Sequence, residues 1–270
     1  MLDADQVRGP LSEALDGRLE ALDVFDEIES TNSYLLAEPA PAAGFIRVAL
    51  ADHQTAGRGR LGRRWVSPPT ACICLSLSYT FTTPPRDFPA ATIAVGIGVA
   101  RSLESLGLRG VGLKWPNDVV IGDGKLGGIL TEVHTSGPGL LTVVVGVGIN
   151  VDLRDAKEVA GMVTRIGDIS DLASCMSDVP PRSIIAVSLI EQIADALMHF
   201  EAQGLGSFLS DWNRLDWLHG QCVSVDSHEH RVSGICEGIE ENGALVLRSD
   251  QVRHRVRSGS VRLGRDGDTG

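Results

Sequence analysis

The 270-residue sequence predicts an α+β protein, with a central mixed β-sheet, helices on one face of it, and a small C-terminal β-barrel. The β-branched run at 140–151 is too apolar for an edge strand and, with the strand-like runs at 111–133, indicates a central mixed sheet. Two long apolar segments, 89–106 and 183–204, have the length and pattern of helices. From about residue 218 the pattern changes to short alternating runs separated by Gly, Asn and Asp, which is typical of a small barrel.

The first elements alternate between helix and strand. Residues 29–38 predict a helix, because a Ser-Thr-Asn sequence can cap its start and two prolines follow it. Residues 45–52 and 71–81 predict strands. In the second strand, residues two apart share a face, so Cys72 and Cys74 are expected to pack as small side chains.

The middle of the chain predicts more of the sheet and then a less regular region. Residues 111–133 contain two strand-like runs around a turn at Gly122–Gly124. Residues 155–180 are rich in Gly, Ser, Asp and Pro and indicate irregular structure, and 205–217 predicts a last helix. We therefore expect a first domain at 1–217 and a second domain, of SH3-like size, at 218–270.

Composition excludes several classes of protein. A net charge of −11 argues against nucleic-acid binding, which depends on neutralising phosphates. No uninterrupted apolar stretch of about 18 residues predicts a membrane span, and the first residues lack the pattern of a signal peptide. Five cysteines without a CxxC spacing indicate neither a disulfide framework nor a zinc site, so a reducing cytoplasm is expected.

A local basic segment stands out against this acidic background. In GRGRLGRRW, residues 57–65, glycines alternate with arginines directly after a predicted strand. Glycines let backbone N–H groups approach a ligand, and guanidinium groups bind phosphate or carboxylate in a forked geometry. The segment predicts an anion-binding loop, although on its own it is equally compatible with a solvated surface loop or a short basic patch that contacts nucleic acid.

Four further motifs accompany this loop: ESTN at 29–32, KWPND at 114–118, KLGGILTE at 125–132 and GVGIN at 146–150. In order and content the set resembles the biotin protein ligases, over most of residues 25–263. The resemblance implies a catalytic domain of the class II aminoacyl-tRNA synthetase and biotin ligase type at 1–217. It also implies an SH3-like C-terminal domain.

The reaction that the resemblance implies joins biotin to ATP as biotinyl-5′-AMP, with release of pyrophosphate. Biotin then passes to a lysine of a biotin carboxyl carrier domain in an acyl-CoA carboxylase. ATP and Mg²⁺ are the expected cofactors, and the protein is expected to be a monomer or a homodimer.

Motif matching assigns the site residues one by one. The residues that match the family's biotin-binding positions are Ser30, Thr31, Asn32, Gln54, Gly57, Arg58, Arg60, Trp65, Lys125, Gly128 and Gly146. The residues expected to bind the nucleotide are Arg60, Arg63, Lys114, Asn117, Asp118, Gly148 and Asn150. Each residue alone has a plainer interpretation as a helix cap, core side chain, turn former or solvated charge, so the assignments depend on the motifs occurring together.

The expected catalytic residues are Lys125, Arg58, Arg60 and Asp118. Lys125 corresponds to the family's lysine that meets the biotin carboxylate and the α-phosphate, where a point charge assists the attack of one anion on another. Arg58 and Arg60 are expected to neutralise phosphate in the transition state, and their loop to exclude water. Asp118 is expected either to orient or deprotonate the carrier lysine or to bind Mg²⁺.

Some features differ from the family pattern. About 24 residues precede the region of the resemblance, too few for the DNA-binding domain of bifunctional members, so the resemblance is to the monofunctional ligases. Gly127 stands where alanine is common, and no aromatic residue between 155 and 180 offers adenine stacking. Lipoate ligases and octanoyltransferases are the nearest alternative, a biotinyl-AMP-sensing DNA regulator is another, and an inactive biotin-binding module is a third.

Overall fold

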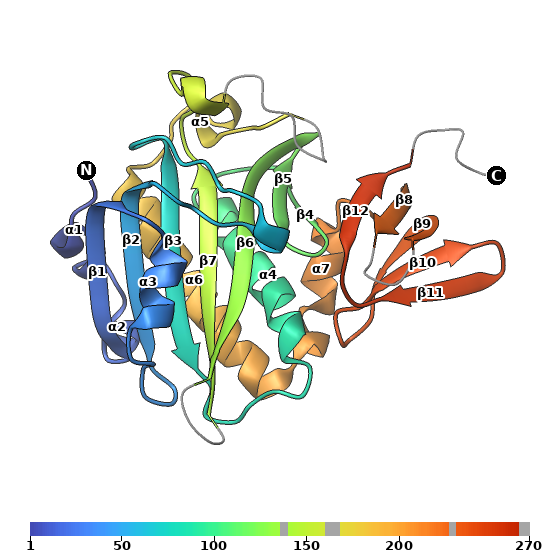
Figure 1. Ribbon diagram of the computed structural model, residues 1–270, viewed down its shortest axis with the longest axis horizontal. Helices are drawn as coiled ribbons and strands as arrows, with labels where there is room; N and C mark the ends of the chain where they lie inside the picture. The colour runs from blue at the N-terminus through green and yellow to red at the C-terminus, as the bar shows by residue number, and fades with distance from the viewer. Residues whose placement is uncertain (136–139, 160–167, 227–230, 265–270) are drawn as a thin grey trace.

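The computed structural model describes residues 1–135, 140–159, 168–226 and 231–264. In this part of the chain, twelve strands form two sheets (Figure 1). The first sheet has the order β1-β2-β3-β7-β6-β5-β4, with β1 parallel to β2 and the other neighbours antiparallel. Its strands are β1 (Leu19–Ile28), β2 (Ile46–Gln54), β3 (Cys72–Thr80), β4 (Val111–Lys114), β5 (Asp118–Ile121), β6 (Gly124–Thr135) and β7 (Leu141–Asn150). The predicted central mixed sheet is confirmed.

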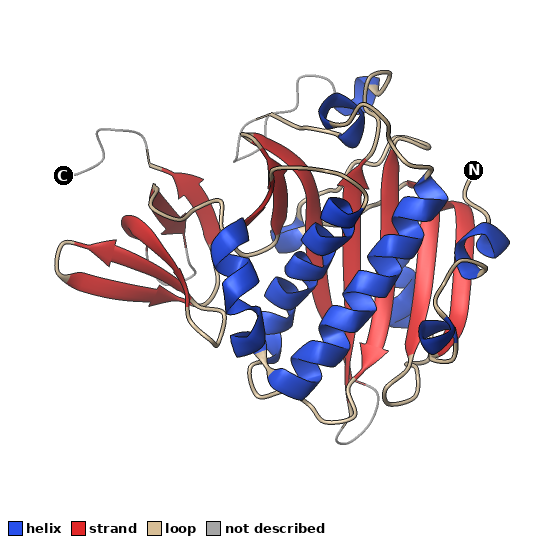
Figure 2. Cartoon of the chain, turned by 180° about the vertical axis from the view of Figure 1, so that it is seen from behind, coloured by secondary structure: helices blue, strands red, loops and turns tan. Residues whose placement is uncertain are grey.

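Two long helices cover one face of this sheet (Figure 2). They are α4 (Ala91–Ser105) and α6 (Arg182–Gln203), and the short helix α3 (Thr31–Ala37) lies on the opposite face. The remaining helices are α1 (Ala4–Arg8), α2 (Glu13–Asp16), α5 (Leu172–Cys175), α7 (Leu209–Leu215) and the 3₁₀ turns η1 (Arg60–Gly62), η2 (Phe88–Ala90), η3 (Lys157–Val159) and η4 (Leu205–Phe208). The opposite face therefore stays largely free of helices, and the candidate site forms there.

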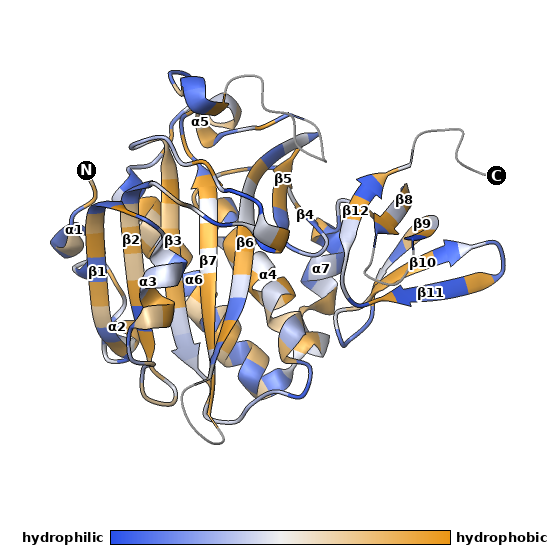
Figure 3. Ribbon diagram, viewed as in Figure 1, coloured by the Kyte–Doolittle hydropathy of each residue, from blue (hydrophilic) through white to orange (hydrophobic). Residues whose placement is uncertain are grey.

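Glycines bring α4 and α6 close together. A Cβ at Gly98 would lie 2.6 Å from the carbonyl oxygen of Gln192, and one at Gly96 would touch Leu113 and Ile129 of the sheet. These glycines lower the helix propensity of the segment, yet the close approach that they permit fills the core. Figure 3 shows apolar residues along most of the central strand β7.

The region 111–133 forms three strands, where the sequence predicted two. KWPND is itself the tight turn between the four-residue strands β4 and β5, which pair from Val111–Ile121 to Lys114–Asp118. The predicted turn at Gly122–Gly124 then joins β5 to β6. Two strands of only four residues are too short to show a period of their own in the sequence.

The first sheet begins earlier in the chain than residues 45–52, the first range that the sequence predicted as a strand. The first strand, β1, starts at Leu19, after two short helices, and pairs with β2 along the edge of the sheet. Its sequence LEALDVFDEI carries four acidic residues and is mostly half-buried. An edge strand of this kind lacks both the alternation and the apolar run that identify strands in sequence.

The C-terminal strands form an antiparallel sheet in the order β11-β10-β9-β8-β12. They are β8 (Cys222–Asp226), β9 (Arg231–Ile239), β10 (Leu245–Ser249), β11 (Val252–Val256) and β12 (Ser260–Leu263). The apolar side chains of this sheet join those of the first sheet in one continuous core, and the Trp115 indole donates to the carbonyl of Gly243 at 3.0 Å. The SH3-like module is consistent with this sheet, whereas the division at 217/218 into domains stays a prediction.

Two sequence expectations concern α6 and the region before it. Helix α6 has the length and mean hydropathy of a membrane span, but 56% of its most apolar window is buried in the protein, as in a core helix. The expected irregular region at 155–180 contains only the short η3 and α5 where it is described, and residues 160–167 lie outside the described residues.

A buried ion pair joins β2, α6 and the N-terminus, and it predicts a large loss of stability. Arg182 Nη2 lies 2.6 Å from Asp52 Oδ1, their side chains are 14% and 5% exposed, and Asp52 also accepts from the backbone N–H of Leu2. Asp52→Asn leaves a buried guanidinium without its counter-charge, so we expect the free energy of unfolding to fall by about 3–5 kcal/mol in urea titrations.

Asp16→Asn is the matched control, because the exposed pair of Asp16 with Arg8 has the same chemistry without burial. It is expected to cost no more than about 1 kcal/mol. Equal losses for the two variants would show that burial of the first pair is not what makes it important.

Candidate active site

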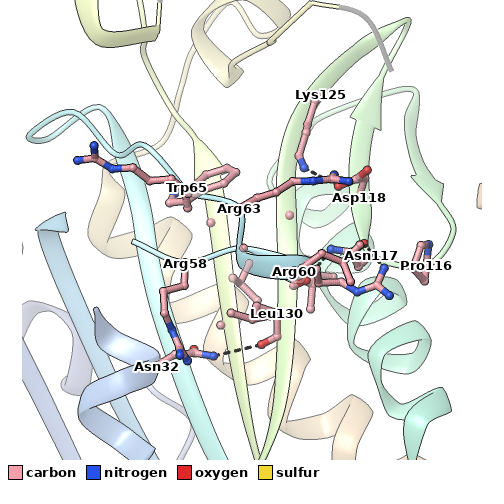
Figure 4. A pocket seen from close by; sticks show the side chains of 18 of the residues that line it. Asn32, Arg58, Arg60, Arg63, Trp65, Pro116, Asn117, Asp118, Lys125 and Leu130 are labelled. Carbon is pink, nitrogen blue, oxygen red and sulfur yellow. Dashed lines mark hydrogen bonds and ion pairs between the residues drawn. The ribbon is translucent and has the colours of Figure 1, made fainter. Parts of the chain in front are cut away.

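The assigned residues surround one pocket on the face of the first sheet opposite α4 and α6 (Figure 4). The arginine loop covers β6 and β7 there, KWPND forms one end, and residues 259–261 of the C-terminal sheet complete the wall. Every residue assigned from the sequence lines this pocket except Gly57 and Asn150. Segments distant in the sequence thus meet in one place, as the motifs predicted.

The arginine loop is a hairpin with a 3₁₀ turn at its tip. Trp65 N donates to Gly57 O at 2.9 Å, and Gly59 N donates to Arg63 O at 2.7 Å. A Cβ at Gly57 would lie 2.5 Å from Trp65 O, so only glycine fits at the base of this hairpin. At the tip, Leu61 has φ +57° and is 61% exposed. Gly57 therefore shapes the loop without lining the pocket.

Because Gly146 and Gly148 of β7 lack side chains, the surface of the sheet has a shallow depression at each of them, called here the Gly146 seat and the Gly148 seat. Gly146 lies between Ser76 of β3 and Leu130 of β6, and Gly148 lies between Cys74 and Gly128 in the same way. The carboxamide of Asn32 occupies the first seat, and the indole of Trp65 the second, because a Cβ at either glycine would overlap them. Protein side chains therefore lie against the backbone at both glycines.

One end of the pocket is a network of neutral polar groups. Thr31 N and Oγ1 lie 2.9 Å and 3.2 Å from Gln54 Oε1, and Ser76 Oγ lies 2.7 Å from Thr31 Oγ1. Ser76 Oγ is also 2.6 Å from Asn32 Oδ1, and all four side chains are buried. Ser30 accepts from Ser33 N and caps α3, so the plain helix-cap interpretation holds for this residue as well.

The other end carries the charges. Lys125 Nζ lies 2.5 Å from Asp118 Oδ1, and Arg60 Nη1 donates to Asn117 Oδ1 at 3.1 Å. Burial lowers the pKa of Arg60 below its ordinary value, although an arginine remains cationic at neutral pH. Since a desolvated cation interacts strongly with an incoming anion, this end is suited to phosphate.

The C-terminal sheet contributes directly to this charged end. Lys114 is 3% exposed, and its Nζ donates to Val261 O at 3.1 Å. Arg63 Nη2 lies 3.0 Å from Ser260 Oγ, so the arginine loop also reaches β12. Neither contact was expected, because residue types in a small barrel do not indicate which surface it packs on.

Two arginines expected to act together point to opposite ends of the pocket (Figure 4). Arg60 extends toward Asn117, whereas the guanidinium of Arg58 lies near Asn32 and pairs with the carboxylate of Glu132. Glu132 belongs to the KLGGILTE motif but received no role. It could have been found, because Gly128, Leu130 and Glu132 alternate along β6 and so share a face.

Asn150 lies just outside the pocket. Its Nδ2 donates to Ser170 O at 2.9 Å and lies 3.4 Å from Lys125 O. The side chain thus fixes the start of β6, where Lys125 sits, to the segment before α5. Its expected contact with the nucleotide stays a prediction.

The cysteines and acids of the described residues form no group of three or more that could hold a metal. For Mg²⁺ the pocket offers the single carboxylate of Asp118, which fits an ion that ATP phosphates would also hold, since Mg²⁺ sites in such enzymes use one or two carboxylates. Burial raises the pKa of Cys74 to about 11, so its thiol stays neutral and is not a nucleophile at pH 7.

Comparison with known proteins gives the same picture over nearly the whole chain. Residues 24–150 match the model of the biotin/lipoate A/B protein ligase family. The chain is 34% identical over 261 residues to the biotin–[acetyl-CoA-carboxylase] ligase of Mycobacterium tuberculosis, covering 92% of this chain and 93% of that protein. It is also 34% identical over 267 residues to the bifunctional ligase/repressor BirA of Escherichia coli, covering 97% of this chain and 78% of BirA.

A solved structure agrees in fold. The biotin protein ligase of Aquifex aeolicus in complex with biotin and ATP superposes with a TM-score of 0.74 at 25% identity, covering 91% of this chain and all of that one. Sequence and structure both lead to one assignment, and the chain belongs to the biotin/lipoate A/B protein ligase family, with the biotin protein ligases among its relatives.

Proposed function

We propose that this protein is a biotin protein ligase that activates biotin with ATP and transfers it to a lysine of a biotin carboxyl carrier domain. The observation that carries the proposal is the division of one pocket into a neutral polar end and a cationic end. A ureido ring, uncharged and rich in hydrogen-bonding groups, suits Thr31 and Gln54. A carboxylate and a triphosphate suit Lys125 and Arg60.

In the first step, an oxygen of the biotin carboxylate attacks the α-phosphorus of ATP, and pyrophosphate leaves. Two anions must approach each other, so their repulsion is the main obstacle. Lys125 supplies a positive charge held in place by Asp118, and Arg60 supplies a second charge on the loop. Mg²⁺ carried by ATP would be held through Asp118 and would shield the triphosphate.

In the second step, the neutral amine of the carrier lysine attacks the acyl carbon, and AMP leaves with the bonding electrons. A lysine amine is mostly protonated at pH 7, so one proton must first depart. The sequence left two roles open for Asp118, action on the carrier lysine or binding of Mg²⁺. Its contact with Lys125 supports a further role, orientation of the Lys125 ammonium group in the first step. Deprotonation of the carrier lysine by Asp118 would then require the two to separate.

The cysteine content and the net charge support proposals for the location of the reaction and for its partners. Five free cysteines suit a reducing cytoplasm, where carboxylases act on acyl-CoA. The net charge of −11 supports a ligase without a DNA-binding role for the sequence given. The carrier domain of an acyl-CoA carboxylase is the expected protein substrate.

The proposal predicts a specific mass change. Incubating an apo carrier domain with this protein, biotin, ATP and Mg²⁺ should add one biotin, measured by intact-mass spectrometry, and omission of ATP should abolish the gain. Parallel reactions with lipoate in place of biotin test the sister ligases. A lipoyl gain would overturn the choice of substrate, and no gain with either acid would overturn the ligase proposal.

Replacement of Lys125 should remove the positive charge at which the two anions meet. We expect Lys125→Ala to slow formation of biotinyl-AMP by at least about 10²-fold, the usual effect of losing one group that stabilises a transition-state charge. Pyrophosphate release under single-turnover conditions measures the rate. Lys157→Ala, in the 3₁₀ turn η3, is the matched control, and near-normal turnover in Lys125→Ala would contradict the assignment.

The seat at Gly148 predicts a loss of binding without loss of fold. In Gly148→Ala the new Cβ would lie about 2.5 Å from Trp65 Cζ2, so the indole must leave its place. Because Trp65 lines the pocket, we expect the KM for biotin to rise about tenfold or more. Gly206→Ala is the control, because its new Cβ would lie 3.8 Å from the nearest atom, and an unchanged KM in Gly148→Ala would refute a role for the seated indole.

A further inference from the structure

Glu132 receives two donors from different segments. Its carboxylate forms an ion pair with the guanidinium of Arg58 on the arginine loop, and its Oε2 also accepts from Asn32 Nδ2 at 2.9 Å. The side chain of Glu132 is 27% exposed, so the pair is partly shielded from water. A carboxylate in this position connects the loop to the fixed part of the pocket.

Asn32 is held firmly where it meets Glu132. It is 3% exposed and sits in the Gly146 seat. Its Oδ1 lies 2.6 Å from Ser76 Oγ, and its Nδ2 donates to Leu130 O as well as to Glu132. Both amide hydrogens are thus used within the protein, which leaves none for a ligand.

Continuous polar contacts therefore run from the neutral end of the pocket to the loop. They pass from Gln54 through Thr31, Ser76 and Asn32 to Glu132, and end at Arg58. The members before Glu132 are buried on the sheet and on α3. Of the residues in this series, Arg58 belongs to the arginine loop. The loop can therefore separate from the series when the ion pair between Arg58 and Glu132 breaks.

We propose that Glu132 is a positioning residue that latches the arginine loop over the pocket through Arg58. Arg60 and Arg63 of the same loop bond to neutral partners, Asn117 and Ser260, whereas Arg58 pairs with a carboxylate, and the tip of the loop is exposed at Leu61. Arg58, engaged by Glu132, serves closure of the loop, and Arg60 is the arginine that faces the phosphate end. The two arginines that the sequence treated as equivalent then have different roles.

The latch predicts a defect in retention of the intermediate. This test rests on the proposed function, because it follows escape of biotinyl-AMP from the enzyme into solution. Glu132→Gln keeps the hydrogen bond from Asn32 and removes the charge that holds Arg58. We expect escape to rise about tenfold, the loss typical of one charge-assisted hydrogen bond, while the unfolding midpoint stays near that of the unaltered protein.

A double-variant cycle separates a latch from a general structural role. If Glu132 acts through Arg58, then Glu132→Gln adds nothing to the escape rate in an Arg58→Ala background. An equal increase in both backgrounds would overturn the proposal, and so would an unchanged escape rate in the single variant. Glu104→Gln is the matched control, because it removes the carboxylate partner of Arg214 on the surface away from the pocket.

A second readout needs neither biotin nor ATP. Trypsin cleaves after arginine where the backbone can unfold locally, and opening of the loop frees the backbone around Arg60 and Arg63 for such cleavage. Limited proteolysis followed by mass spectrometry should show about tenfold faster cleavage there in Glu132→Gln than in the unaltered protein or in Glu104→Gln. Equal cleavage rates would overturn the latch. Absence of biotinyl-AMP with the unaltered protein would instead count against the proposed function, and proteolysis would still decide on the latch.

Discussion

Close approach to the backbone of β7 is the constraint on which the pocket depends. A sheet surface normally carries a side chain at every second position, which keeps other segments at a distance. At Gly146 and Gly148 that layer is missing, so Asn32 and Trp65 reach the backbone itself. The helix α3 and the arginine loop are thereby brought over the same part of the sheet. The rest of the site is arranged around these two contacts.

The charges are separated along the same surface. Neutral donors and acceptors gather where α3 meets β2 and β3, and cations gather where KWPND meets β6 and the C-terminal sheet. At the charged end, Asp118 is the partner of Lys125 and Asn117 that of Arg60, and at the opposite end Glu132 pairs with Arg58. An anionic ligand must therefore compete with partners already present, which restrains non-specific binding of anions to this basic cluster.

Most of the fold and the members of the site could be predicted, because both follow from strong local signals. Apolar periodicity identified the central strands and the two long helices, and a set of linked motifs identified the pocket residues. What escaped prediction depends on tertiary contacts. The acidic edge strand β1, the pairing of Arg58 with Glu132 and the packing of Ser260 against Arg63 all depend on which surfaces meet. No single segment carries that information.

The contacts of β12 have a consequence for how the protein comes into being. Val261 and Ser260 meet Lys114 and Arg63 across nearly 150 and 200 positions of sequence. A ribosome must have translated through this strand before the pocket wall is complete. Incomplete nascent chains hold the arginine loop and KWPND without that wall. The capacity to confine a reactive acyl phosphate therefore arises only after β12 has been synthesised.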